Sequence, residues 1–236
     1  MTQTIKVHPD TSKLSNKTEI KDKPLCENFE IRKNLNNALL IKEPFNHWTF
    51  EKVLPKNLFD KVLKLPIDPP VINTYSGKRE TNNKTRIFFN SENCKKYECM
   101  EEIAEIFNSD KIVSTLSLIS GNDLSKGKLR IEYTLDTGDF WLEPHLDIKQ
   151  KMITFIIYLS SDTNDYTKDW GTTIYNKDLT LNSKIPYKQN TGFMFIPGQN
   201  TWHGIPRQYI FGVRRNLIIN YVSSDWKSIN ELYKLS

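Results

Sequence analysis

The first half of the chain carries apolar residues at helical spacing. Residues 55–65 start with a proline and place Leu58, Val62 and Leu65 on one face, before a proline-rich stop. The segments 99–107 and 111–120 repeat this spacing, and the second ends at a Gly-Asn pair. The sequence therefore predicts helices over residues 55–65, 99–107 and 111–120.

After residue 128 the pattern changes to short apolar runs, separated by segments rich in turn-forming residues. Two earlier runs have the same character. The predicted strands cover residues 37–42, 86–89, 129–135, 141–147, 152–159, 172–175, 192–196 and 216–222. Helices followed by a run of strands favour an α+β fold built on a β-sandwich or barrel.

The same pattern divides the chain into regions of one globular domain. Residues 1–35 are predicted to be a polar N-terminal arm, and residues 36–127 a bracing region of helices and strands. Residues 128–225 would be the β core, followed by a C-terminal helix at 226–236. The long polar loop 71–84 is a candidate substrate-binding element, because long loops in compact domains are often functional.

Composition agrees with a folded chain. Of the 236 residues 38% are hydrophobic, including twelve Phe and ten Tyr, which argues against disorder. No apolar run of about 18 residues and no secretory signal is present, so we expect a soluble, cytoplasmic protein with no membrane partner. The cysteines Cys26, Cys94 and Cys99 form no metal-binding cluster and favour a reducing compartment.

Charge adds little about partners. The net charge of +5 is spread over lysine-rich loops rather than gathered in one stripe, which argues against nucleic acid as a partner and leaves a small-molecule substrate as the expectation. The oligomeric state does not follow from the sequence.

The candidate chemistry is a metal site at His145-Leu146-Asp147. Side chains two apart on a strand share a face, so one strand can supply two ligands. His203 is the best third ligand, because His8 lies in the polar arm and His47 has no acidic neighbour at strand spacing. Two histidines and a carboxylate suit non-haem Fe(II). A catalytic zinc site also takes three protein ligands, so a zinc hydrolase stays open from the ligands alone.

Residues 128–225 resemble the double-stranded β-helix (jelly-roll, cupin-like) core of the Fe(II)- and 2-oxoglutarate-dependent oxygenases, in the prolyl-hydroxylase-like branch. The pieces that carry the resemblance are Tyr133…Gly138…His145-x-Asp147, Thr154 to Leu159, Trp170-Gly171-Thr172, His203…Pro206 and Gly212-Val213-Arg214-x-x-Leu217. The resemblance covers less than half of the chain.

This resemblance implies Fe(II), 2-oxoglutarate as co-substrate and dioxygen, with ascorbate as a stimulant in vitro. It implies that Arg214 binds the distal carboxylate of the oxoacid, a role for which Arg215 competes, and that Tyr158 and Tyr133 hydrogen-bond it. A guanidinium suits this role because it binds a carboxylate with two parallel bonds.

Strand alternation gives a separate argument for Arg214. If Arg214 points into the barrel, then Asn216, Ile218 and Asn220 do so too, which places Asn220 as a cofactor-binding candidate. Leu217, Ile219 and Tyr221 would then pack outward against helices.

The implied activity is hydroxylation of an unactivated C–H bond by a 2-oxoglutarate/Fe(II)-dependent dioxygenase. The first expectation for the substrate is a small polar metabolite or amino acid, and the alternative is a peptidyl, prolyl-type hydroxylase. An alternative of another class is a non-catalytic metal-binding jelly-roll module. Candidate substrate contacts are Arg86, Trp141, Trp202 and Thr172, and Lys149, Lys151 and the 71–84 loop could also contribute.

Overall fold

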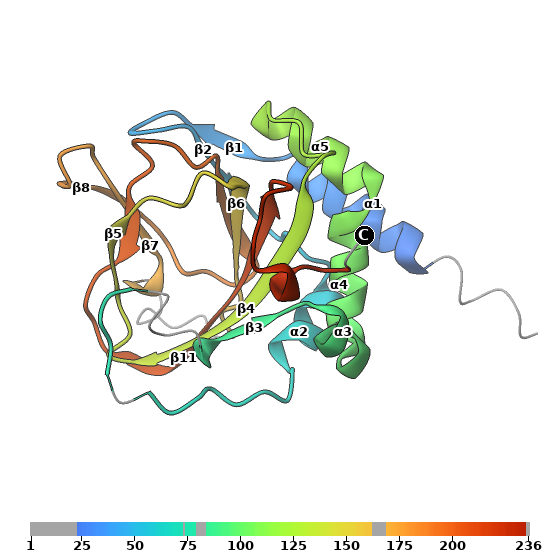
Figure 1. Cartoon of the computed structure of the whole chain (residues 1–236), viewed down its shortest axis with the longest axis horizontal. Helices are drawn as coiled ribbons and strands as arrows, with labels where there is room; N and C mark the ends of the chain where they lie inside the picture. Colours follow the sequence, from blue (N-terminus) through green and yellow to red (C-terminus); the bar gives the residue numbers. More distant parts are fainter. Residues whose placement is uncertain (1–22, 73, 79–83, 162–168, 235–236) are drawn as a thin grey trace, which may run out of the picture.

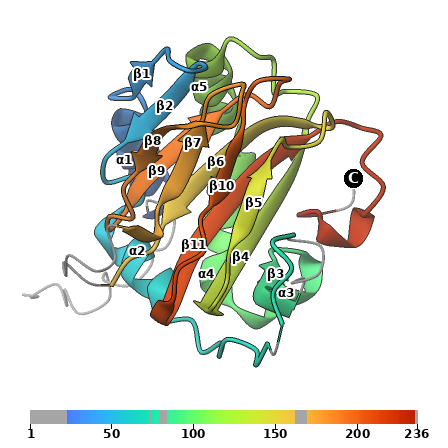
Figure 2. The same cartoon turned by 90° about the vertical axis from the view of Figure 1, so that its left-hand side faces the viewer.

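The computed structural model describes residues 23–72, 74–78, 84–161 and 169–234. Helices cover one face of a seven-stranded antiparallel sheet, and a four-stranded antiparallel sheet faces its other side (Figures 1 and 2). The expected mixture of helices with antiparallel β-structure is confirmed. Within the described ranges, no helix has the length and apolar character needed to cross a membrane.

The large sheet is built around the longest strand. Its strands lie in the order β1 (Leu39–Ile41), β2 (His47–Phe50), β9 (Thr191–Phe195), β6 (Lys151–Tyr158), β11 (Ile210–Val222), β4 (Lys128–Gly138) and β3 (Arg86–Phe88). Strand β11 pairs with β6 on one side and with β4 on the other. It therefore has neighbours on both sides along most of its length.

The small sheet contains the strands β5 (Leu142–His145), β10 (His203–Ile205), β7 (Thr172–Tyr175) and β8 (Leu181–Ile185), in that order. Strands β5 and β8 are its edges. An apolar cluster that includes Tyr158, Trp170, Tyr187 and Phe193 fills part of the space between the two sheets.

The helices are α1 (Lys23–Leu35), α2 (Lys56–Leu63), α3 (Ser91–Lys96), α4 (Glu98–Asn108) and α5 (Asp110–Ser120). Helices α4 and α5 bury apolar faces, and α5 ends at Gly121, whose φ of 72° is the left-handed conformation that glycine tolerates. Together with the outer face of the large sheet, the helices enclose the main hydrophobic core.

Strand β11 separates this core from the space between the sheets. Leu217, Ile219 and Tyr221 belong to the core beneath the helices, as expected. Arg214 and Asn216 are buried on the opposite face. The alternation predicted from the sequence is therefore confirmed along this strand.

The expected polar arm of residues 1–35 is wrong in its last part. Residues 23–35 form α1, and Ile31 and Leu35 are fully buried in the core. An apolar pair one turn apart within a charged segment is too short a stripe to reveal a helix by periodicity. Residues 1–22 lie outside the described residues.

The expected C-terminal helix at 226–236 is also wrong. Among the described residues 226–234, the structure has a 3-10 turn at Ile229–Glu231 and no α-helix. The chain is held by contacts with β4 instead, because the backbone N–H of Tyr233 donates to the carbonyl of Leu129 and Arg130 binds Glu231. Strands β2, β8 and β10 and helix α3 are further elements that the sequence pattern did not predict.

The buried side of β11 gives a stability prediction. Leu217→Ala should lower the free energy of unfolding by about 2–5 kcal/mol, because Leu217 is fully buried and its loss leaves a cavity. The control Leu118→Ala removes a leucine that is 84% exposed on α5, and should change stability by less than about 0.5 kcal/mol. Urea denaturation of both variants measures the difference, and equal effects would contradict the placement of Leu217.

Candidate metal centre

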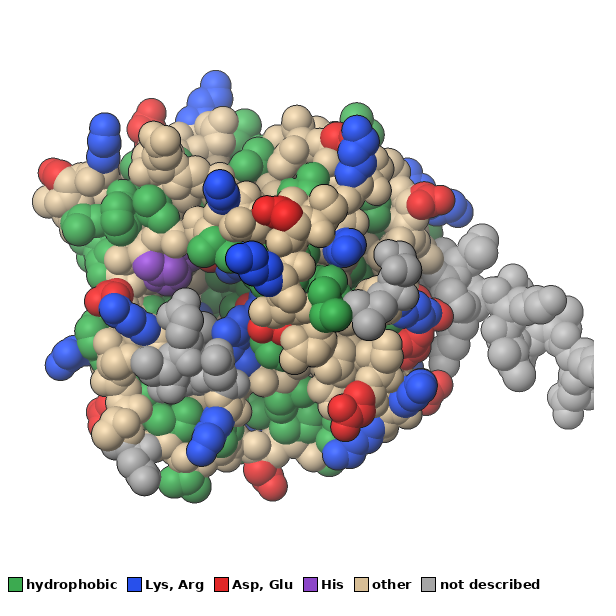
Figure 3. Space-filling view, in the orientation of Figure 1, with side chains coloured by type: hydrophobic (Ala, Val, Ile, Leu, Met, Phe, Trp, Pro, Cys, Tyr) green, Lys and Arg blue, Asp and Glu red, His purple; other side chains and the backbone are tan. Residues whose placement is uncertain are grey.

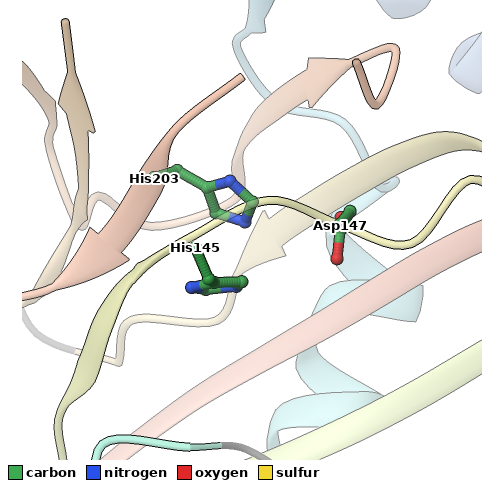
Figure 4. A group of neighbouring side chains, drawn as sticks. All are labelled: His145, Asp147 and His203. Carbon is green, nitrogen blue, oxygen red and sulfur yellow. The ribbon is translucent and has the colours of Figure 1, made fainter. Parts of the chain in front are cut away.

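Two histidines meet because two short strands of the small sheet pair in one register. His203 on β10 lies directly opposite His145 on β5. Directly opposite residues of an antiparallel pair bring their side chains together. The ring centroids are 4.3 Å apart, and Figure 4 shows the two imidazoles one above the other.

Asp147 completes the group from just beyond β5. The strand ends at His145, so the predicted strand 141–147 is shorter than expected, yet the carboxylate of Asp147 lies beside the two rings (Figure 4). The ligand atoms of the three residues all lie within 4.8 Å of one another. The sequence prediction that these residues come together is confirmed.

Hydrogen bonds fix the orientation of both rings. Nδ1 of His145 lies 2.8 Å from the carbonyl oxygen of Glu143, and Nδ1 of His203 lies 2.9 Å from that of Thr201. Because a carbonyl only accepts, each Nδ1 carries the proton and each Nε2 keeps its lone pair for a metal.

His203 and Asp147 have the charge states that a metal needs. Burial, together with the neighbouring His145, lowers the pKa of His203 to about 4, so its ring is neutral at neutral pH. Burial opposes ionisation of Asp147, but the ammonium of Lys151, His203 and the hydroxyl of Thr154 outweigh it and hold the pKa of this carboxyl well below its usual range.

The carboxylate of Asp147 is held by two neighbours on β6. The Thr154 hydroxyl donates to Oδ2 at 2.6 Å, and Nζ of Lys151 lies 2.5 Å from Oδ1. The Thr154 hydroxyl in turn accepts a bond from the side-chain amide of Asn220. The expected cofactor contact Asn220 thus lies behind Thr154 and orients the Asp147 carboxylate through it.

These three side chains fit a divalent metal. Two neutral imidazole nitrogens and one ionised carboxylate are the donor set of a facial site that leaves positions open. His47 has the same type of Nδ1 bond, to the carbonyl of Phe45, but its ring packs against Phe45 and Phe193 in the apolar cluster. His145, Asp147 and His203 therefore form the candidate metal centre.

The metal centre opens into a cavity of about 350 Å³ between the sheets. On the face drawn in Figure 3, a histidine reaches the surface beside Lys or Arg and acidic side chains, on the side of the small sheet. Of the sequence candidates, Arg214, Arg86, Thr172 and Lys151 line the cavity together with the metal ligands.

Arg214 is buried in this cavity with an acidic partner. Its Nη1 donates to Asp136 on β4 at 2.8 Å, and its Nε donates to the backbone oxygen of Trp170. A guanidinium has five donors, so an anion in the cavity can be bound while these two bonds persist. Arg215 is not among the described residues that line the cavity.

The two tyrosine candidates lie in different places. The buried hydroxyl of Tyr158 donates to the hydroxyl of Thr172 at 2.7 Å, so Tyr158 lies one layer behind a residue of the cavity wall. Tyr133 pairs with Leu217 and faces the helix core, on the other side of the sheet. The expected contact of Tyr133 with the oxoacid is therefore wrong, because the strand's alternation turns its neighbours Thr134 and Glu132 inward.

The structure does not bring the two tryptophans to the cavity. Trp141 packs against Gly77, where an added Cβ would lie 2.4 Å from the ring, and Arg207 stacks on it at 4.2 Å. Trp202 is half-buried next to His203. The exposed Lys149 also lies away from the cavity.

Part of the predicted 71–84 loop borders the cavity. Gly77 and Lys78 line it, and the carbonyl of Gly77 accepts a bond from the backbone N–H of Glu143 on β5. Residues 73 and 79–83 lie outside the described residues.

Sequence reasoning missed several residues of the site. Asp136 pairs with Arg214, Tyr187 packs beneath its guanidinium, and Arg130, Glu132 and Glu231 form ion pairs in the cavity wall. The alternation of charged residues at 130 and 132 on the predicted strand 129–135 is a signal for this face. Asp136 lies just beyond that predicted strand, and the observed β4 extends through it, so that all three share the face that the pairing with β11 turns inward.

Several solved structures of prolyl hydroxylases have a similar fold. A prolyl-4-hydroxylase from Pseudomonas putida aligns with a TM-score of 0.54 and 11% identity over 84% of this chain and 93% of that one. A prolyl hydroxylase from Trichoplax adhaerens, solved with a hypoxia inducible factor peptide fragment, aligns with a TM-score of 0.53 and 13% identity, over 89% and 94%.

A prolyl 4-hydroxylase from Phytophthora capsici aligns with a TM-score of 0.54 and 11% identity, over 90% of this chain and 68% of that one. No family model and no curated protein matches the chain by sequence. The chain therefore has the fold of the prolyl hydroxylases, and the resemblance to the prolyl-hydroxylase-like oxygenases seen in the sequence is confirmed at the level of the fold.

The contact between Lys151 and Asp147 gives a prediction about metal binding. A metal bound at Asp147 would share that carboxylate with the ammonium of Lys151, which lies 2.5 Å from Oδ1. Two positive unit charges about 4 Å apart repel by about 4 kcal/mol at an effective dielectric constant of 20, before solvent screening, and a divalent ion doubles this repulsion. Lys151→Met should therefore tighten metal binding about tenfold or more, measured by titrating the metal-free protein with Fe(II) or Mn(II) without oxygen.

The control Lys149→Met removes a lysine two residues away that is exposed, and should leave the metal affinity unchanged. Weaker metal binding in Lys151→Met would show that the lysine supports the site rather than competing with the metal.

Proposed function

We propose that this protein is a Fe(II)- and 2-oxoglutarate-dependent dioxygenase that hydroxylates an unactivated C–H bond. His145, Asp147 and His203 would hold the iron, and Arg214 would bind the distal carboxylate of 2-oxoglutarate. Within this proposal, the two facing sheets are the double-stranded β-helix of such oxygenases.

One observation carries the proposal: three metal-ligating side chains and a buried arginine line the same cavity. Arg214 is paired with Asp136 inside the cavity, and a guanidinium has five donors, so it can bind an anion there and keep that pair. A zinc hydrolase gives no reason for Arg214. An oxoacid that binds the metal at one end needs a fixed cation for its other end.

The residues around the centre have separable tasks. Bound iron and 2-oxoglutarate supply oxidation of the substrate by dioxygen, and the oxoacid leaves as succinate and carbon dioxide. Thr154 and Asn220 orient the carboxylate of Asp147. Asp136 and Trp170 hold the Arg214 guanidinium in a fixed direction, and Tyr158 keeps Thr172 in place in the wall.

We propose a small polar metabolite or an amino acid as the substrate. The cavity of about 350 Å³ lies at the lower end of the range usual for small-molecule sites. The peptidyl alternative keeps support from the fold, because the similar Trichoplax adhaerens structure is a complex with a peptide. A non-catalytic metal-binding module is the alternative of another class, and a test of turnover separates it from both.

Succinate formation from 2-oxoglutarate tests the proposed activity. The full chain with Fe(II), ascorbate and air, without added substrate, should form succinate slowly, and His145→Ala should reduce the rate at least 100-fold because a metal ligand is lost. His47→Ala is the matched control: it removes a buried histidine outside the metal centre and should keep the activity of the folded fraction.

Circular dichroism checks that both variants fold. Succinate formation that survives in His145→Ala would contradict the metal assignment. If the wild type forms no succinate and shows no oxoacid charge-transfer band with Fe(II) under anaerobic conditions, the oxygenase proposal fails.

Arg214 and Arg215 provide a second test. Arg214→Gln should raise the 2-oxoglutarate concentration for half-maximal rate tenfold or more, equivalent to about 1.4 kcal/mol of binding energy. Arg215→Gln should change it less than about twofold, because Arg215 is not part of the cavity wall. Steady-state kinetics with varied 2-oxoglutarate give both values, and the reverse order of effects would rule out Arg214 as the anchor.

A further inference from the structure

The wall of the cavity contains four charged side chains joined end to end, here called the charge chain. Arg86 pairs with Glu132, Arg130 binds Oε1 of Glu132 at 2.9 Å, and Nε of Arg130 binds Glu231 at 2.6 Å. All four side chains line the cavity that holds the metal centre. Two of them are cationic and two anionic, so their formal charges cancel.

The charge chain lies at the far end of β4 from the proposed oxoacid anchor. Arg130, Glu132 and Asp136 share one face of the strand, and Asp136 is the partner of Arg214. At about 3.4 Å per residue, the four steps from Glu132 to Asp136 span about 14 Å. The charge chain is therefore separate from the residues proposed to bind 2-oxoglutarate.

The two ends of the charge chain are more accessible than its middle. The side chains of Arg130 and Glu132 are 1% and 4% exposed, whereas those of Arg86 and Glu231 are 13% and 18% exposed. The Arg130 guanidinium is also fixed by the rings of Phe88 and Trp226, at 4.8 and 5.1 Å. Arg86 therefore presents a positive charge to the cavity at one end of the charge chain, and Glu231 presents a negative charge at the other end. Arg130 and Glu132 hold the two ends in place.

Protein stability alone does not explain why four charged side chains are placed in the wall of the cavity. Burying charges costs several kcal/mol per ion, and buried ion pairs often contribute little net stability. Apolar side chains would dock the C-terminal segment onto β4 at less cost. A polar ligand with charges of both signs would gain from paired groups that are already oriented.

Resting on the proposed function, we propose that the charge chain binds the substrate to be hydroxylated, and that this substrate is a free α-amino acid. Its carboxylate would bind Arg86, and its ammonium would face the carboxylates of the charge chain, Glu132 beside Arg86 and Glu231 beyond Arg130. A residue within a peptide has neither charge on its backbone. A substrate with only negative charge would meet Glu132 and Glu231 as well as the arginines.

The test measures the binding of ligands that differ by one charge. The twenty common L-amino acids are titrated into the full chain, loaded with Fe(II) and 2-oxoglutarate without oxygen, and compared with their N-acetyl and amide forms. A capped prolyl peptide is included. We expect at least one free amino acid to bind and to accelerate succinate formation in air, and each blocked form to bind at least tenfold more weakly.

Two variants assign the charges to residues. In Arg86→Gln the preference for the free acid over its amide should disappear, and in Glu231→Gln the preference for the free amine over its N-acetyl form should disappear. A general structural defect would weaken all ligands alike. The controls Arg207→Gln and Glu51→Gln remove exposed charges outside the cavity and should keep both preferences.

The outcomes separate this inference from the proposed function. Tight binding of the capped peptide, or of blocked forms as well as free ones, would overturn the amino-acid assignment while succinate formation still supports the oxygenase. Binding of no amino acid would overturn it too. Selective binding of a free amino acid without any iron-dependent succinate would instead support the charge chain and overturn the proposed function.

Discussion

The structure depends on the register of β11 between β4 and β6. Because this strand has partners on both sides, a shift by one residue would turn every side chain to the opposite face. The actual register sends Leu217 and Ile219 to the helix core and Arg214 to the cavity. Core packing and the chemistry of the site are thus set by the same hydrogen-bond ladder.

The sequence predicts the structure best where the two-residue alternation of a β-strand decides which way each side chain points. Alternation placed Arg214 on the correct face, and the residue types and short spacing of His145 and Asp147 indicated a metal site. The resemblance alone places Tyr133 in the cavity, but Tyr133 lies opposite Leu217 in the ladder between β4 and β11 and therefore faces the helix core. Local alternation was a better guide than resemblance there.

The remaining parts depend on contacts between distant segments, which periodicity does not show. Helix α1 is stabilised by burial of two apolar residues against the core rather than by a long amphipathic stripe. The position of the C-terminal segment is determined by its contacts with β4. One of these contacts is the ion pair between Glu231 and Arg130, which are 101 positions apart. Strand β10 has only three residues, and its partners on either side define it.

The strand that carries His145 is an edge of the small sheet, and exposed edge strands can recruit strands of other molecules. Here the edge is covered, because Gly77 accepts the backbone N–H of Glu143 and Trp141 packs on that glycine. The same segment lines the cavity. Its sequence must therefore satisfy two demands at once, ligand selection and protection against aggregation, and evolution towards a new substrate through this segment would be limited by solubility.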